Sequence, residues 1–260
     1  MGNLTGKRIL ITRASGQIEG VAKRVCQHGG VPIAFPCLAV TCLAESVRGA
    51  VKLLGGNGVQ ALFTSVNGVN CVAEALGDTF ISTFQSVPVV VIGRHTADAL
   101  EERGVRITWM PQNASQEGLM DAWRQHGLPM RLVFFRAEQG RNMLPETLKE
   151  AGVDVHLVPA YRTICPNDDA SAVIQSLKNG EIDAVLLGSS RTAEHYMRRI
   201  GETALANRPA IAVISEQVAN TARTINLDVQ VVAKEASFAS MLDGLELWFQ
   251  KMAANGESHA

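Results

Sequence analysis

The sequence predicts an α/β protein with two domains, each built on a parallel sheet. Short apolar runs typical of buried strands alternate with stretches of helical periodicity. The opening order of strand, helix, glycine and strand also occurs a second time. The two occurrences are 123 residues apart. Such a long interval indicates two copies of one α/β unit, because the repeats of solenoid proteins are much shorter. Four corresponding pairs, Arg8 and Arg131, Arg13 and Arg136, Gly29 and Gly152, and Pro36 and Pro159, are each 123 residues apart.

The first copy opens with a basic-ended strand over 8–12 and a helix over 17–28. Further strands are predicted at 31–35, 59–63, 89–92 and 105–109. The run from Val89 to Ile92 is rich in β-branched residues, which predicts a strand buried on both faces. Gly93 lets the chain leave that strand sharply, and Thr96 can cap the next helix.

The second copy repeats this order. Its strands are predicted at 131–135, 153–158, 182–187, 210–214 and 228–232, and a closing helix at 237–252. Residues 60–63 and 183–186 keep the interval of 123, while Pro88 and Pro209 are 121 apart. In open parallel sheets ligands bind beyond the carboxyl ends of the strands, so the loops at those ends are the candidate sites.

Composition limits the function classes. The formal net charge is −1 and aromatic residues make up 5% of 260 residues, which argues against a nucleic-acid partner. No apolar run approaches the ~20 residues of a membrane helix, and the first residues lack a signal-peptide pattern. We therefore expect a cytoplasmic protein without a membrane partner.

Cysteine and histidine spacing predicts neither a disulfide framework nor a metal site. The five cysteines are odd in number and form no C-x-x-C pair, so free thiols are the better interpretation. The six histidines lie far apart, and we expect no bound metal.

The loops after the predicted strands carry hydroxyls, amides, glycines and a few arginines, and few acids. This set suits a ligand with several carboxylates or phosphates, held by helix amino termini and main-chain amides. The candidate binding residues are Arg13, Thr64, Ser65, Asn67, Gly68, Gly93, Ser115, Glu117, Gly118, Arg136, Gly140, Arg141, Ser189 and Ser190.

Each hydroxyl also has a purely structural interpretation, because Ser, Thr and Asn commonly cap helices. Arg13 and Arg136 are more informative, since arginines repeated at strand ends have no capping duty there. His95 fits a surface or capping residue. The sequence has no dinucleotide or P-loop glycine motif and no nucleophile elbow, which argues against those enzyme classes.

Several stretches together resemble the uroporphyrinogen-III synthase family. No single stretch is highly specific, but their order and spacing are, and together they span nearly the whole chain. They are residues 6–13, 36–40, 61–69, 91–100, 115–119 and 136–152, and the segment Tyr161-Arg162-Thr163.

The resemblance implies two flavodoxin-like domains joined by a two-stranded linker, with the ligand between them. The first domain would comprise residues 1–36 and 167–260, and the second residues 37–166. It also implies a monomeric, cofactor-independent lyase that cyclises the linear tetrapyrrole hydroxymethylbilane, with loss of water and inversion of the last ring. Delivery of that substrate by hydroxymethylbilane synthase stays open. Tyr161 matches a family tyrosine suited to assist hydroxyl departure, and Thr96 a family threonine near the substrate.

Two loops of the second copy depart from the family pattern. Gly188-Ser189-Ser190 replaces Thr-Ser-Pro, and Val218 stands where a threonine is usual, with Glu216 nearby. These changes motivate an alternative, a non-catalytic tetrapyrrole- or small-molecule-sensing domain of the same fold. A two-domain carboxylate- or sugar-binding protein of unrelated lineage is a third hypothesis.

Overall fold

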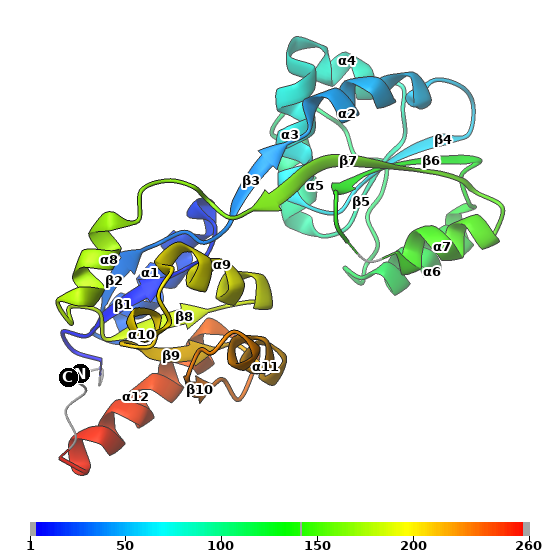
Figure 1. Cartoon of the computed structure of the whole chain (residues 1–260). Coiled ribbons are helices and arrows are strands. Elements are labelled where there is room, and N and C mark those ends of the chain that lie inside the picture. The colour runs from blue at the N-terminus through cyan, green and yellow to red at the C-terminus, as the bar shows by residue number, and fades with distance from the viewer. Residues whose placement is uncertain (1–3, 141, 257–260) are drawn as a thin grey trace. The chain divides into compact units, whose positions relative to one another are not determined.

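The computed structural model describes residues 4–140 and 142–256 (Figure 1). The chain divides into two compact units: residues 1–39 with 164–260 form unit 1, and residues 40–163 form unit 2. The boundaries between the two units lie at 39/40 and 163/164. The chain therefore passes from one unit to the other twice.

Unit 1 is built on a five-stranded sheet with the order β10-β9-β8-β1-β2, in which neighbouring strands run parallel. This arrangement confirms the predicted α/β class. Its elements are β1 (Arg8–Ile11), α1 (Ile18–Gln27), β2 (Val31–Ala34), α8 (Ser171–Lys178), β8 (Ala184–Leu187), α9 (Ser190–Ile200), α10 (Thr203–Ala206), β9 (Ala210–Val213), α11 (Glu216–Thr224), β10 (Val229–Val232) and α12 (Phe238–Ala254).

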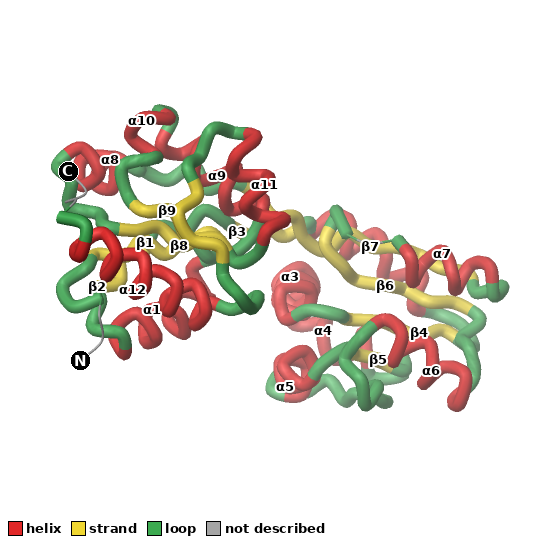
Figure 2. The backbone as a smooth tube through the Cα atoms, turned by 90° about the horizontal axis from the view of Figure 1, so that it is seen from below, coloured by secondary structure: helices red, strands yellow, loops and turns green. Residues whose placement is uncertain are grey.

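Helices cover both faces of this sheet. In Figure 2, α1 and α12 lie on one face and α8 to α11 on the other. Successive strand residues point to opposite faces, so Ile9 and Ile11 pack toward α1 and α12 while Leu10 packs toward the opposite layer. Burial on both faces explains why the strand sequences are continuously apolar rather than alternating.

Unit 2 contains the second sheet, with the order β3-β7-β6-β4-β5. Helices α6 and α7 cover one face, and α2 to α5 cover the other. Its elements are β3 (Ala39–Cys42), α2 (Ala44–Ala50), β4 (Val59–Phe63), α3 (Val66–Leu76), α4 (Phe80–Phe84), β5 (Val89–Val91), α5 (Arg94–Glu101), α6 (Gln116–His126), β6 (Arg131–Ala137), α7 (Met143–Glu150) and β7 (Asp154–Ile164).

Strand register agrees with the duplication. Arg8 pairs with Val31 in unit 1 and Arg131 with Asp154 in unit 2, so both partners shift by 123 residues. The pairing of β1 with β8 and of β6 with β4 deviates slightly. Ile9 pairs with Ala184, and its equivalent Leu132 pairs with Gln60, so the partners Gln60 and Ala184 are 124 rather than 123 residues apart. The two sheets are thus copies of one pattern, with a slip of one residue in this pairing.

Three sequence predictions about strands differ from the structure. Residues 105–109 form no strand, and only Trp109 makes an isolated bridge, to Val90. β3 was not predicted. β7 continues through Pro159 to Ile164, because the pairing with β6 shifts between Arg136 and Ala137 and the proline falls at this irregularity.

The prediction that the cysteines are free thiols is wrong for two of them. Cys42 on β3 and Cys71 on α3 form a disulfide, while Cys26, Cys37 and Cys165 are free. These two cysteines are 29 residues apart in the sequence, and only the packing of β3 beside α3 brings them together.

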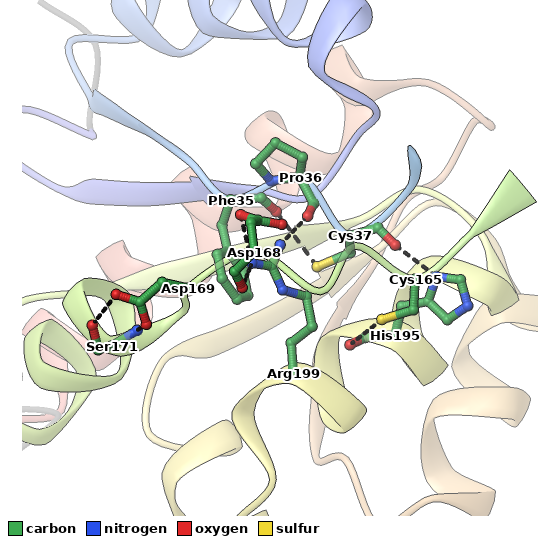
Figure 3. Close-up of polar contacts among 9 residues, drawn as sticks. All are labelled: Phe35, Pro36, Cys37, Cys165, Asp168, Asp169, Ser171, His195 and Arg199. Carbon is green, nitrogen blue, oxygen red and sulfur yellow. Dashed lines mark hydrogen bonds and ion pairs between the residues drawn. The ribbon is translucent and has the colours of Figure 1, made fainter. Parts of the chain in front are cut away.

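The two segments that connect unit 1 to unit 2, around residues 36–37 and 165–168, are bonded to side chains of α9 (Figure 3). His195 Nδ1 lies 2.6 Å from the carbonyl oxygen of Cys37, and Arg199 donates to the carbonyl oxygen of Pro36. Arg199 also forms an ion pair with Asp168, with 2.9 Å between Nη2 and Oδ2. Helix α9 therefore fixes where the chain enters and leaves this unit.

Candidate functional site

In unit 2, most of the candidate residues lie at the carboxyl edge of the sheet. The loops after β4, β5 and β6 begin at neighbouring parallel strands, so Ser65, Gly93 and the end of β6 share one edge. Tyr161, on β7, pairs with Ala137 at the end of β6. The fold therefore gathers residues that are up to about a hundred positions apart in the sequence.

Ser65 and Tyr161 contact each other through their hydroxyls. Their oxygens lie 3.0 Å apart, and Ser65 Oγ also accepts a hydrogen bond of 3.1 Å from the Gly68 N–H, as the N-cap of α3. Tyr161 is only 9% exposed. A side chain at Gly68 would approach both the Ser65 hydroxyl and the Tyr161 ring. The phenol is thus held at the positive end of a helix.

Arg136 is a nearly buried cation without a carboxylate partner among the described residues. It is 8% exposed, its guanidinium lies 5.4 Å from the Phe134 ring centre, and Nη1 is 3.5 Å from Asn142 Oδ1. Burial lowers the pKa of Arg136, and the nearby Tyr161 partly opposes that shift. A Cβ at Gly140 would collide with the end of the Arg136 side chain, so the guanidinium would have to move to admit one. The neighbouring candidate Arg141 lies outside the described residues.

Gly93 has the positive φ of 86° expected for a sharp exit from β5. The prediction that Thr96 caps α5 is wrong, because Gly93 is the N-cap and Thr96 lies inside the first turn. Thr96 is 4% exposed, and no side chain or backbone group among the described residues hydrogen bonds to its hydroxyl. This hydroxyl is therefore available to a ligand. His95 is exposed, as expected.

The remaining candidates in unit 2 have smaller roles in its contacts. Thr64 and Asn67 are half-buried beside Ser65. Ser65 and Ser115 both act as helix caps, and Ser115 accepts from the Gly118 N–H at 3.0 Å. Glu117 is exposed in the first turn of α6. Helix capping alone is thus sufficient to explain the serine at position 115.

In unit 1, the candidates also lie at the carboxyl edge, after β1 and its neighbour β8. Ser189 forms a capping box with Thr192 at the start of α9, and Ser190 bonds Thr221 of α11 at 2.8 Å. Arg13 donates twice to Gln17 and lies 5.0 Å from the Phe238 ring centre.

The structure shows the contacts of two residues at which the sequence departs from the family pattern. Val218 is 5% exposed and packs in the core of unit 1. Glu216 forms an ion pair of 2.6 Å with Arg223. Neither change leaves an unpaired negative charge at this edge.

Sequence reasoning missed Phe238, which follows the predicted start of the closing helix, and Arg24, which lies on α1. Both line a hollow beside Arg13. The predicted helix start at Ser237 could have pointed to Phe238. The contact between α12 and the loop after β1, however, cannot be read from the sequence.

Two features are absent from the described part of the chain. Its residues contain no cluster of three His, Cys, Asp or Glu side chains that could hold a metal. Within the same residues, no helix is long and apolar enough to cross a bilayer.

The fold and the two polar sheet edges define a class: duplicated α/β proteins with two parallel-sheet units and polar loops at the strand ends. The family model described as "Uroporphyrinogen-III synthase HemD" matches residues 19–243. The chain therefore belongs to the uroporphyrinogen-III synthase family. Family membership confirms the resemblance of the sequence.

Similar proteins agree with this assignment. A uroporphyrinogen-III synthase of Synechococcus elongatus is 26% identical, over 94% of this chain and 96% of the relative. One of Chlorobaculum parvum is 25% identical, over 87% and 92%.

Among solved structures, a uroporphyrinogen-III synthetase of Helicobacter pylori has a TM-score of 0.59 at 13% identity, over 94% of this chain and 99% of that one. A mutant uroporphyrinogen III synthase of Thermus thermophilus has a TM-score of 0.54 at 19% identity, over 95% and 100%. At these identities the likeness concerns the fold.

Proposed function

We propose that this chain is a uroporphyrinogen-III synthase, which cyclises hydroxymethylbilane to uroporphyrinogen III with inversion of the last ring and loss of water. The observation that carries the proposal is the Tyr161 hydroxyl, held by Ser65 beside an unpaired Arg136. Family membership supplies the substrate class, and this cluster supplies groups suited to the chemistry.

The first step is departure of the terminal hydroxyl. Tyr161 donates its phenolic proton to that oxygen as the carbon–oxygen bond breaks, so that water leaves and an electrophilic azafulvenium cation forms. If Ser65 donates its own hydroxyl proton to the Tyr161 oxygen, the phenolic proton is free to point at the substrate. The Ser65 oxygen is in turn occupied by the Gly68 N–H, which favours this direction.

The charge left on Tyr161 is then stabilised by its surroundings. Arg136 interacts electrostatically with Tyr161, and the amino terminus of α3 lies behind Ser65. The proton released when the last ring regains aromaticity returns to the phenolate, which balances the cycle without electron transfer. The reaction as proposed therefore needs no cofactor.

Ring inversion depends on positioning, because the substituted carbon must attack rather than the free one. The hydroxyl of Thr96, a residue that is 4% exposed, is one contact for this purpose. The main-chain N–H groups of the first two residues of α3 and of α5 are others, since they have no partner inside the helix. Carboxylate side chains of the substrate would accept these bonds.

The test is to supply freshly generated hydroxymethylbilane and to separate the uroporphyrinogen isomers after oxidation. The proposal expects isomer III well above the spontaneous background, which yields isomer I. Tyr161→Phe should fold normally and form much less isomer III. Tight binding of a tetrapyrrole with only isomer I formed would favour the sensing-domain alternative, and no binding at all would favour an unrelated ligand.

A further inference from the structure

Unit 1 has a hollow of about 520 Å³ between α1 and the start of α12, at the carboxyl edge of its sheet. Its walls include Arg13, Gln17, Arg24 and Phe238, and none of the described residues that line it is a carboxylate. Two guanidinium groups thus border one small space without a compensating negative charge. An anion entering this hollow would meet both of them.

Arg13 is held in place but keeps unused donors. Gln17 Oε1 accepts from Arg13 Nε at 3.1 Å and from Nη2 at 2.7 Å, and the Phe238 ring lies 5.0 Å from the guanidinium carbon. These contacts occupy Nε and one donor of Nη2, whereas Nη1 has no partner among the described residues. Burial lowers the pKa of Arg13, as expected for a cation without a nearby carboxylate. The side chain is therefore oriented in advance for an external anion.

The second wall is the amino terminus of α12. Ser237 caps this helix by accepting from the Ser240 N–H at 3.1 Å. Phe238 and Ala239, in the first turn, line the hollow. N–H groups at these positions have no partner inside the helix. Helix α12 has 17 residues, so its positive end adds to the two arginines.

Gly188 lies against the Phe238 ring, which forms part of one wall of the hollow. A Cβ on Gly188 would lie 2.7 Å from the Phe238 ring, which is too close without movement of the ring. The family's usual threonine at this position would therefore conflict with Phe238 as it is placed here. The glycine admits the ring, and the ring supports Arg13. The departure from the family pattern at Gly188 thus accommodates the Phe238 ring.

The duplication provides an internal comparison. Arg136 occupies the position in unit 2 that Arg13 occupies in unit 1, and it also lies over a phenylalanine ring without a carboxylate partner among the described residues. Arg136 is closed in by Gly140 and Asn142, whereas Arg13 borders open space. Both units retain an arginine without a carboxylate partner among the described residues at this strand end, and the one in unit 1 borders the hollow.

We propose that the hollow lined by Arg13, Arg24 and the first turn of α12 is a carboxylate subsite, which binds an acetate or propionate side chain of the ligand. That the ligand is a tetrapyrrole rests on the proposed function. The subsite itself requires only a carboxylate. Arg13 supplies the oriented contact, and Arg24, which is exposed, supplies a second charge at the rim.

The first experiment is a fluorescence titration with uroporphyrin III, the stable eight-carboxylate oxidation product, against the full chain and four variants. Arg13→Gln and Arg24→Gln should each weaken binding by about three- to tenfold, the range for partly exposed charge pairs. Arg198→Gln is the matched control, because it removes the same charge from the last turn of α9, at the opposite edge of the sheet. Gly188→Ala keeps every charge, yet it should weaken binding by displacing the Phe238 ring.

The second experiment does not depend on the proposed function. Phenylglyoxal modifies arginines, and mass spectrometry follows its rate at each position in the wild-type chain. Saturating propane-1,2,3-tricarboxylate should slow modification of Arg13 and Arg24 at least threefold and leave Arg198 unaffected. Protection in a chain that forms no isomer III would support the subsite while the proposed function fails.

Two results would overturn the subsite. One is formation of isomer III by a chain whose Arg13→Gln and Arg24→Gln variants bind uroporphyrin as tightly as Arg198→Gln. The other is equal modification of all three arginines with and without the tricarboxylate.

Discussion

Replacing Ser65 tests whether the hydroxyl pair acts as one unit. Ser65→Gly removes the oxygen 3.0 Å from the Tyr161 hydroxyl. Glycine is a tolerable N-cap and costs helix α3 only a few tenths of a kcal/mol, whereas Ser65→Ala would cost about 1 kcal/mol. The glycine variant therefore separates the contact with Tyr161 from the stability of the helix.

The expected effect follows from the geometry. A single hydrogen bond between neutral hydroxyls contributes about 0.5–1.5 kcal/mol, which corresponds to roughly a two- to twelvefold lower turnover number if it acts in the transition state. The KM should change little, because Ser65 orients Tyr161 rather than holding the substrate. Ser65→Thr restores a hydroxyl and should recover most of the rate.

The assay is the rate of isomer III formation from hydroxymethylbilane in Ser65→Gly, Tyr161→Phe and the double variant. If the hydroxyls act together, the double variant is about as slow as Tyr161→Phe alone, since the same interaction is lost only once. Strictly additive losses, or a wild-type turnover number in Ser65→Gly, would refute the linkage. Thermal unfolding of each variant checks that the fold is kept.

Three further outcomes are expected. Thr96→Val keeps the shape of a buried side chain and should lower isomer III formation severalfold with no loss of stability, because its hydroxyl has no partner among the described residues; a wild-type rate would remove it from the site. Arg199→Met should lower the free energy of unfolding by about 2–4 kcal/mol in urea titrations followed by circular dichroism, since a side chain only 4% exposed loses its bonds to both crossing segments. Iodoacetamide should label exposed Cys26 in the native chain but leave Cys37 unmodified until denaturation, because burial raises the pKa of that thiol and blocks access, and mass spectrometry reads the pattern.

Patterns confined to one strand and helix were predicted well. The apolar run before Gly93 formed a buried strand, and the positive φ at the glycine is the reason for its presence. Ser65 and Ser115 both cap the helices that follow them. These features depend on residues that are close in the sequence, so they can be predicted from the local sequence alone.

Features that depend on distant segments were predicted poorly. Residues 105–109 have strand-like apolar alternation, but Thr108 bonds the Val89 N–H through its side chain and the segment makes a single bridge. The contact between Ser65 and Tyr161 spans 96 residues. Because β3 and α3 come together only in the folded unit, the disulfide was not predicted either.

The duplicated arginines show that equivalent positions in the two units can have different surroundings. Residue spacing identified Arg13 and Arg136 as equivalent, and register confirms that their strands correspond. The surroundings of the two strand ends differ: Gly140 and Asn142 close around Arg136 beside a tyrosine, whereas Gly188 and Phe238 leave space next to Arg13. A buried cation beside a phenol is suited to stabilising charge that forms during a reaction. A cation at an open hollow is suited to binding charge already present on the ligand. The same ancestral position would then serve proton transfer in one unit and recognition in the other.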